Sequence, residues 1–137
     1  MRLFVDTSSL FKKYVNESGS NDFEKLLSKA SEIAVSPATW IEMNAAIERC
    51  LRSGALTPEK AGWLRAEVKK DFTYFFLVVW NENLENKAVQ LIHQHALKTM
   101  DAVQLASGIL SDSEIFVTSD HPLHRAAKKV IPHVRLV

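Results

Sequence analysis

The sequence predicts an α/β fold, in which a mostly parallel sheet of four to five strands is sandwiched by helices. Short unbroken apolar runs such as Leu3–Val5 and Ile115–Val117 are typical of strands that are covered on both faces. Between these runs, apolar residues recur every three or four positions, which indicates helices. Strands and helices that alternate in this way form parallel sheets with right-handed crossovers.

Length and composition favour one domain spanning residues 1–137, because 137 residues of which 47% are apolar can bury a proper core. The chain has no run of eighteen apolar residues and no export signal at its start, so we expect a cytoplasmic protein without a membrane span. Cys50 is the only cysteine and lies among helical apolar positions, which favours a core residue over a nucleophile.

The first elements are a strand and two short helices. The strand at residues 2–5 is followed directly by Asp6. The next helix is expected to pack its apolar face on the sheet, and this face consists of Leu10, Phe11, Tyr14 and Val15. Ser20 or Asn21 can then cap a second helix over residues 21–30.

A second strand, Ile33–Val35, leads into a long helix. Ser36 and Pro37 stand in the order expected for an N-cap residue and a first-turn proline, and Gly54 ends the helix. Helical spacing places Glu42 at the edge of the apolar stripe, near the sheet.

The middle of the chain predicts an αα-hairpin and then a strand. A further helix starts at Thr57–Glu59 and runs to about Asp71. The aromatic and β-branched run Phe72–Trp80 is strongly β-forming and predicts the third strand. Helical spacing returns between Asn83 and His95.

The last third of the chain supplies two more acids. Thr99 is well placed to cap a helix that carries Asp101 in its first turn, where the helix dipole favours the ionised carboxylate. The fourth strand, Ile115–Val117, is followed by hydroxyl residues and Asp120, which repeats the pattern around Asp6. A short helix and a last strand complete the expected fold, over about Pro122–Lys129 and His133–Leu136.

Parallel strands deliver Asp6 and Asp120 to the same edge of the sheet, and the helices that carry Glu42 and Asp101 begin or pass beside it. Two like charges about 4 Å apart repel by several kcal/mol at an effective dielectric near 20, so the four acids need cations to share them. Hard oxygen ligands without histidine or thiolate suit Mg²⁺ or Mn²⁺, and Mg²⁺ is often held together with substrate phosphate. The natural substrate of such a site is a phosphodiester.

These motifs resemble those of the PIN domain family, and more narrowly the VapC-type toxins of bacterial and archaeal toxin–antitoxin pairs. Val5–Leu10 is similar to the family's opening acid motif and Ser36–Glu42 to its helical glutamate segment. Leu97–Ala106 is similar to the third acid motif and Val117–Asp120 to the fourth. The resemblance covers essentially the whole chain and implies a PIN-like, three-layer α/β/α fold.

The resemblance also implies a metal-dependent endoribonuclease whose acids position one or two Mg²⁺ or Mn²⁺ ions. The catalytic and metal-binding residues that it implies are Asp6, Glu42, Asp101 and Asp120. Asp6 and Asp101 are expected as direct ligands, and the other two acids are expected to act through water. Ser8 and Thr118 are expected to hydrogen-bond a carboxylate or an aqua ligand.

The partners implied by the resemblance are an RNA substrate, a cognate antitoxin protein and a second copy of the chain. Arg125, Lys128 and Lys129 lie in a C-terminal stretch without acids, and we expect them either to bind RNA or to form a solvated helix face. We refer to these three residues as the α-helical cations.

Each acid also has a purely structural interpretation. Asp6 and Asp120 could cap the helices that follow them, and Asp101 could serve the helix dipole alone. Glu42 could be a plain surface acid. Because all four acids occur together at the family's spacings, we favour the catalytic interpretation.

Two other functions compete with a nuclease. A phosphatase with an aspartyl nucleophile needs a second aspartate two residues after the first, and this chain has Ser8 there. A PIN-like module that binds RNA or protein without turnover remains the non-enzymatic alternative.

The histidines and tryptophans are expected to lie outside the site. His95, His121 and His124 are not spaced as metal ligands. Trp40, Trp63 and Trp80 are expected in the core or in dimer contacts.

Overall fold

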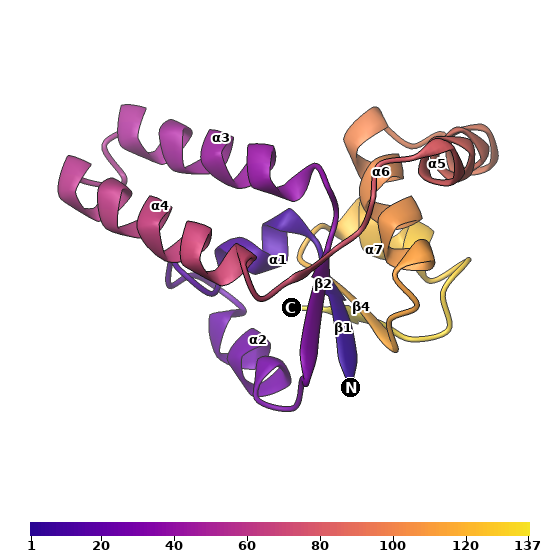
Figure 1. The fold of residues 1–137 in the computed structure, drawn as a ribbon, viewed down its shortest axis with the longest axis horizontal. Coiled ribbons are helices and arrows are strands. Elements are labelled where there is room, and N and C mark those ends of the chain that lie inside the picture. The colour runs from indigo at the N-terminus through magenta and orange to yellow at the C-terminus, as the bar shows by residue number, and fades with distance from the viewer.

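Five strands, all parallel, form the centre of the molecule (Figure 1). The computed structural model describes residues 1–137. The strands are β1 (Arg2–Val5), β2 (Glu32–Val35), β3 (Phe76–Leu77), β4 (Ile115–Thr118) and β5 (Val134–Leu136). The helices are α1 (Thr7–Phe11), α2 (Ser20–Leu27), α3 (Thr39–Arg52), α4 (Pro58–Phe72), α5 (Glu82–His95), α6 (Thr99–Leu110) and α7 (His121–Ala127). The sheet order is β3-β2-β1-β4-β5, which confirms the predicted α/β fold.

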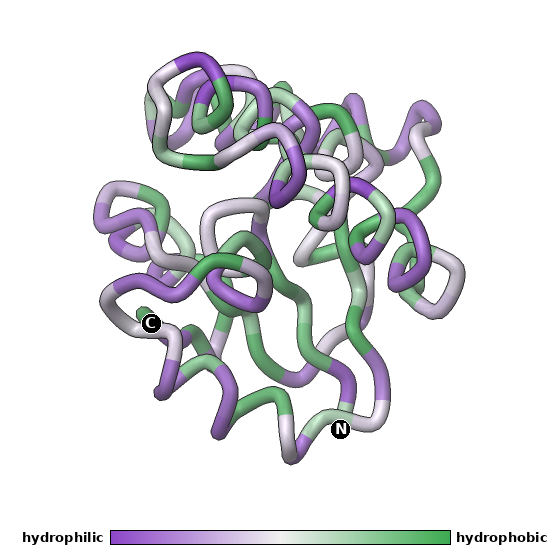
Figure 2. The backbone as a smooth tube through the Cα atoms, turned by 90° about the vertical axis from the view of Figure 1, so that its left-hand side faces the viewer, coloured by the Kyte–Doolittle hydropathy of each residue, from purple (hydrophilic) through white to green (hydrophobic).

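Helices cover both faces of this sheet, so that the strands lie between two apolar cores. On one face, Phe4 of β1 stacks on Phe116 of β4 with ring centroids 5.1 Å apart, and α5, α6 and α7 pack over them. On the other face, Leu3 and Val5 pack against α1, α2, α3 and α4. Successive strand residues point to opposite faces, which explains why the strands are apolar throughout. Figure 2 shows these apolar segments running through the middle of the molecule.

Close packing of α6 on the sheet depends on Gly108. A Cβ atom at this position would lie 2.4 Å from the ring of Phe116, which is closer than any real contact of that kind. The absence of a side chain therefore lets α6 approach the sheet closely. The same helix carries Asp101 in its first turn.

Three neighbouring strands end together at one edge of the sheet. Phe4 of β1 pairs with Ala34 of β2 and with Phe116 of β4. Helices α1, α3 and α7 follow these strands, and α6 leads back to the opposite edge, where the Glu114 amide donates to the Arg2 carbonyl. The N-termini of four helices therefore face the carboxyl edge of the sheet.

The predicted third strand, 72–80, is wrong in length, because only Phe76 and Leu77 pair with β2. The run begins inside α4, where Phe72 contacts the Trp40 ring at 5.2 Å between centroids. Its aromatic residues thus pack between helices or lie exposed at a sheet edge, instead of extending a buried strand.

Three helix starts also differ from the predictions. Helix α3 begins at Thr39 after Ala38, and not at Pro37. Gly19, with a left-handed φ of 90°, precedes α2, which ends at Leu27. Lys98 precedes α6, so that Thr99 is its first residue and not its cap. None of the helices has the length and apolar character needed to cross a bilayer.

Candidate active site

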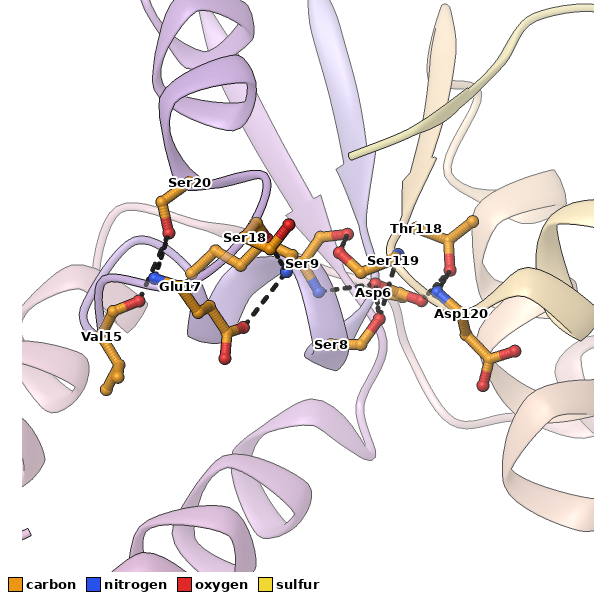
Figure 3. A network of polar contacts seen from close by, with 11 residues as sticks. Asp6, Ser8, Ser9, Val15, Glu17, Ser18, Ser20, Thr118, Ser119 and Asp120 are labelled. Carbon is orange, nitrogen blue, oxygen red and sulfur yellow. Dashed lines mark hydrogen bonds and ion pairs between the residues drawn. The ribbon is translucent and has the colours of Figure 1, made fainter. Parts of the chain in front are cut away.

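Asp6 lies at the carboxyl end of β1 and is only 2% exposed. One carboxylate oxygen, Oδ1, accepts hydrogen bonds from the Ser8 hydroxyl and from the Ser9 backbone amide, both at 2.9 Å. The other oxygen, Oδ2, accepts from the hydroxyl of Thr118 in β4. Asp6 therefore caps α1, as the structural interpretation expects, and also joins the two central strands (Figure 3).

Burial raises the pKa of Asp6 to about 6, and the donors from Thr118, Ser9 and Ser8 lower it in part. None of these donors carries a charge. The six ion pairs of the protein all involve acids other than the four candidates. Asp6 is thus a buried carboxylate that lacks a cationic partner within the chain, which is costly when it is ionised.

Glu42 lies in the first turn of α3, half-buried above the end of β2. Its Oε1 atom accepts from the Thr7 hydroxyl at 2.9 Å and from the Gln104 amide at 2.6 Å. Because Thr7 follows Asp6 directly in the chain, this hydrogen bond brings Glu42 to the same edge as Asp6. Glu42 is therefore held in place by specific donors, unlike a plain surface acid.

Three uncharged residues at this edge were missed from the sequence. The Gln104 Nε2 atom lies 3.1 Å from the Thr7 hydroxyl and 3.2 Å from the Thr39 hydroxyl, in addition to its contact with Glu42. Thr39 stands three residues before Glu42, and Gln104 three residues after Asp101. Residues three apart share a helix face, and this spacing could have identified both.

Asp101 is half-buried in the first turn of α6. Burial raises the pKa of Asp101, the neighbouring charges of Asp120 and Glu42 raise it further, and Lys98 lowers it. Three of the four acids therefore lie close enough to interact electrostatically. Such repulsion from other acids is not expected for a carboxylate whose only role is a favourable interaction with the helix dipole.

Asp120 follows β4 and caps α7, with its Oδ1 atom 3.0 Å from the Leu123 backbone amide. The backbone amide of Asp120 donates at 3.0 Å to the Thr118 hydroxyl, which itself donates to Asp6. Figure 3 shows the Asp120 carboxyl group pointing away from Asp6. Asp120 is thus linked to Asp6 through Thr118, while its carboxylate caps a helix.

The four carboxylates reach one edge but do not form the compact cluster expected from the sequence. No three His, Cys, Asp or Glu side chains lie close enough together to hold a metal ion. The physical reason is that protein donors hold each of Asp6, Glu42 and Asp120 separately.

The donor set nevertheless fits a hard divalent cation. It consists of carboxylates and hydroxyls without thiolate or imidazole, which is the chemistry that Mg²⁺ and Mn²⁺ prefer. Burial is the main cause of the raised pKa of both Asp6 and Asp101, and neither carboxylate forms an ion pair with a Lys or Arg side chain.

A groove of about 420 Å³ runs beside Glu42, between α1 and α3. Thr7, Phe11 and the exposed Arg49 line it. Cys50 also lines this groove and is half-buried, so its predicted place in the core is wrong. Arg49 thus brings a positive charge to the acidic edge, a role that nothing in the sequence pattern indicated.

The α-helical cations lie on α7 or directly after it, and all three are exposed. Helix α7 begins at the acidic edge with Asp120 and runs away from it. With a rise of 1.5 Å per residue, Arg125 is about 8 Å along the helix from Asp120, and Lys128 is about 12 Å along it. Their contact with RNA stays a prediction.

The structure tests where the tryptophans lie and leaves the prediction about the histidines open. Trp40, Trp63 and Trp80 are 39%, 58% and 51% exposed, which excludes the core interpretation. Their dimer contacts stay a prediction. That the histidines are not metal ligands stays a prediction.

Solved structures of similar fold include a toxin–antitoxin complex and a toxin. A toxin–antitoxin complex from Klebsiella pneumoniae has a TM-score of 0.69 and 19% identity, covering 98% of this chain and 96% of that one. VapBC2 from Rickettsia felis, bound to a DNA fragment from its promoter, has a TM-score of 0.67 and 13% identity over 100% and 99%. The Sarcin-Ricin loop cleaving toxin VapC20 of Mycobacterium tuberculosis has a TM-score of 0.69 and 16% identity over 90% and 94%.

At such low sequence identities, the similarity to these structures establishes the fold alone. No curated protein matches the sequence. The PIN domain profile, however, matches residues 3–129, which include all four candidate acids. With its strand order, its helical layers and this match, the chain belongs to the PIN domain family.

Proposed function

We propose that this protein is an endoribonuclease that hydrolyses RNA phosphodiester bonds with Mg²⁺ or Mn²⁺, and that it is the toxin of a type II toxin–antitoxin pair. The observation that carries the proposal is the meeting of Asp6, Glu42, Asp101 and Asp120 at one sheet edge of a PIN domain, without a Lys or Arg ion pair to any of them. The toxins among the similar solved structures support the assignment.

In this proposal, Asp6 and Asp101 hold the ion directly, and Glu42 and Asp120 act through water. Divalent ions at such a site supply a water of lowered pKa for in-line attack and stabilise charge on the phosphoryl oxygens. Ser8 and Thr118 keep the Asp6 oxygens oriented. The groove beside Glu42 takes the RNA strand, and Arg49 contacts a phosphate there.

The proposed partners are a cognate antitoxin and a second copy of the chain, in the cytoplasm. Large apolar side chains on the surface support protein contacts, since Trp63, Tyr74 and Val79 are 58%, 80% and 67% exposed. Similar folds in toxin–antitoxin complexes are consistent with such contacts.

The test is cleavage of total RNA by the chain purified free of any co-expressed inhibitor, with Mg²⁺, with Mn²⁺ and with EDTA. We expect cleavage only with metal, and its loss in Asp6→Asn and Asp101→Asn, because each substitution removes a proposed direct ligand. The matched control is Asp22→Asn, an exposed acid in the first turn of α2. Full activity of Asp6→Asn or Asp101→Asn would contradict the proposal.

One observation favours the second candidate, a PIN-fold module that binds RNA or protein without turnover. The carboxylates do not form a group ready to hold a metal. Calorimetric titration with Mn²⁺ at neutral pH separates the two functions, because the nuclease must bind the ion and the module need not.

A further inference from the structure

Gln104 is a buried amide that contacts the acidic edge without being one of the candidate acids. It is 4% exposed and lies on the second turn of α6. Its Nε2 atom is 2.6 Å from Glu42 Oε1, the shortest of its three contacts. We propose that Gln104 is a positioning residue, which holds Glu42 in the orientation from which it acts on the divalent ion through water; this inference rests on the proposed function.

The hydrogen-bond pattern fixes which end of the amide faces the acid. An ionised carboxylate only accepts hydrogen bonds, so the NH₂ group of Gln104 must face Glu42. The Nε2 atom donates to Glu42 Oε1 at 2.6 Å and lies 3.1 and 3.2 Å from the hydroxyl oxygens of Thr7 and Thr39. The orientation of Gln104 is therefore dictated by Glu42.

The opposite end of the same amide has no partner. The Gln104 Oε1 atom is buried and accepts no hydrogen bond in the protein. An unpaired buried oxygen opposes folding, so this end of the amide contributes no hydrogen bond to the packing of α6. The polar contacts of the Gln104 side chain are therefore those that its Nε2 atom makes to Glu42, Thr7 and Thr39.

The position of Gln104 in the chain connects it to three of the candidate acids. It stands one turn after Asp101 on the same helix, so that α6 carries one proposed ligand and also orients Glu42. Its contact with Thr7 reaches the residue that follows Asp6. Removing the amide leaves Glu42 with a single donor, the Thr7 hydroxyl.

The test compares Gln104→Met with wild type in the full-length protein. Methionine has a similar length and volume but no donor, and it removes the orphaned oxygen. Metal-free thermal unfolding and Mn²⁺ calorimetry are measured on both proteins, with kcat and KM for RNA at saturating Mn²⁺. We expect the metal-free Tm of the variant to equal or exceed that of wild type, with Mn²⁺ affinity reduced about tenfold and kcat reduced more than KM is raised.

Two further variants keep this test decisive. Gln104→His retains an N–H donor at a similar reach and is expected to restore Mn²⁺ affinity toward the wild-type value, even if Gln104→Met folds poorly. Ser107→Ala is the matched control on the same buried face of α6, because its hydroxyl bonds only the Val103 carbonyl of its own helix. We expect wild-type Mn²⁺ affinity in that control.

The outcomes separate this inference from the proposed function. Equal Mn²⁺ affinity in wild type and Gln104→Met overturns the inference alone. The inference is also overturned if Gln104→Met has a much lower metal-free Tm and Gln104→His does not restore Mn²⁺ binding. That result would assign Gln104 to helix packing. A wild-type protein that binds no Mn²⁺ and cleaves no RNA overturns the proposed function and the inference together.

Discussion

Replacing Asp6 with asparagine should change how the stability of the metal-free protein depends on pH. The carboxyl group is 2% exposed, and burial raises its pKa from the ordinary value of 3.8 to about 6. Asparagine has the same shape but never carries the charge. The variant therefore removes the cost of ionising this buried group while leaving the surrounding packing in place.

The sign follows from comparing the folded and unfolded chains. Between pH 3.8 and about 6 the unfolded chain has lost the Asp6 proton and the folded protein has kept it. Raising the pH through this window therefore favours unfolding, and the effect is constant above it. At about 1.4 kcal/mol per pH unit, the difference between the two pKa values amounts to about 3 kcal/mol.

The assay is urea unfolding at 25 °C in EDTA, from pH 4 to pH 7.5, for wild type and Asp6→Asn. Subtracting the two curves cancels the other titrating groups, because they are present in both proteins. Between pH 4 and pH 7 we expect the free energy of unfolding of the variant to rise by about 2.4 kcal/mol relative to wild type, or about 8 °C in Tm, because part of the titration of the unfolded chain lies below pH 4. Asp22→Asn, which changes an exposed acid, should give a difference that does not vary with pH.

A difference curve that is flat or that runs in the opposite direction would refute the account of Asp6 as an uncompensated buried charge. Adding Mn²⁺ at pH 7 extends the test, because an ion bound by Asp6 stabilises the wild type by mass action and the variant much less. Equal stabilisation of both proteins would place the ion elsewhere.

The remaining predictions concern helix packing and RNA binding. Gly108→Ala should destabilise the protein by about 1–3 kcal/mol in urea unfolding, because the added Cβ meets the Phe116 ring at 2.4 Å. Gly62→Ala, exposed within α4 and without a neighbour within 4 Å, should instead stabilise it by about 0.5–1 kcal/mol, and the opposite ranking would contradict this packing account. Arg49→Gln should weaken RNA binding and make its salt dependence shallower by about one phosphate contact, as measured by fluorescence anisotropy in EDTA. Neutralising the α-helical cations together should also weaken binding if α7 lies along the RNA, and an unchanged salt slope would return them to a solvated helix face.

Much of the fold could be predicted because its strands are buried on both faces. Leu3–Val5 and Ile115–Val117 have no polar residue to interrupt them, and the structure pairs them side by side at the centre of the sheet. The run Phe72–Trp80 led to the prediction of a strand that is too long. Aromatic residues serve helix contacts as well as strands, and local composition cannot tell the two apart.

The candidate site could be predicted as far as its acids and the edge they share. Asp6 follows a strand and Asp101 begins a helix, and both positions are visible in the sequence. The hydrogen bonds of Ser8 and Thr118 to Asp6 confirm the prediction that these hydroxyls bond a carboxylate. The anchoring of Glu42 could not be predicted, because it depends on Thr7 and Gln104, which come from two helices far apart in the sequence. Arg49 was missed for the same reason, since only the packing of α1 beside α3 brings it to the groove.

The pairing of β4 with β1 has a consequence for when the protein can act. The ribosome releases β1 first, but the strand that carries Thr118 and precedes Asp120 emerges more than a hundred residues later. Until β4 docks, the hydroxyl that bonds Asp6 is missing and Asp120 has no fixed place. A nascent or truncated chain that stops before β4 therefore lacks the assembled edge, so the proposed nuclease activity can begin only after β4 has been made and has paired with β1.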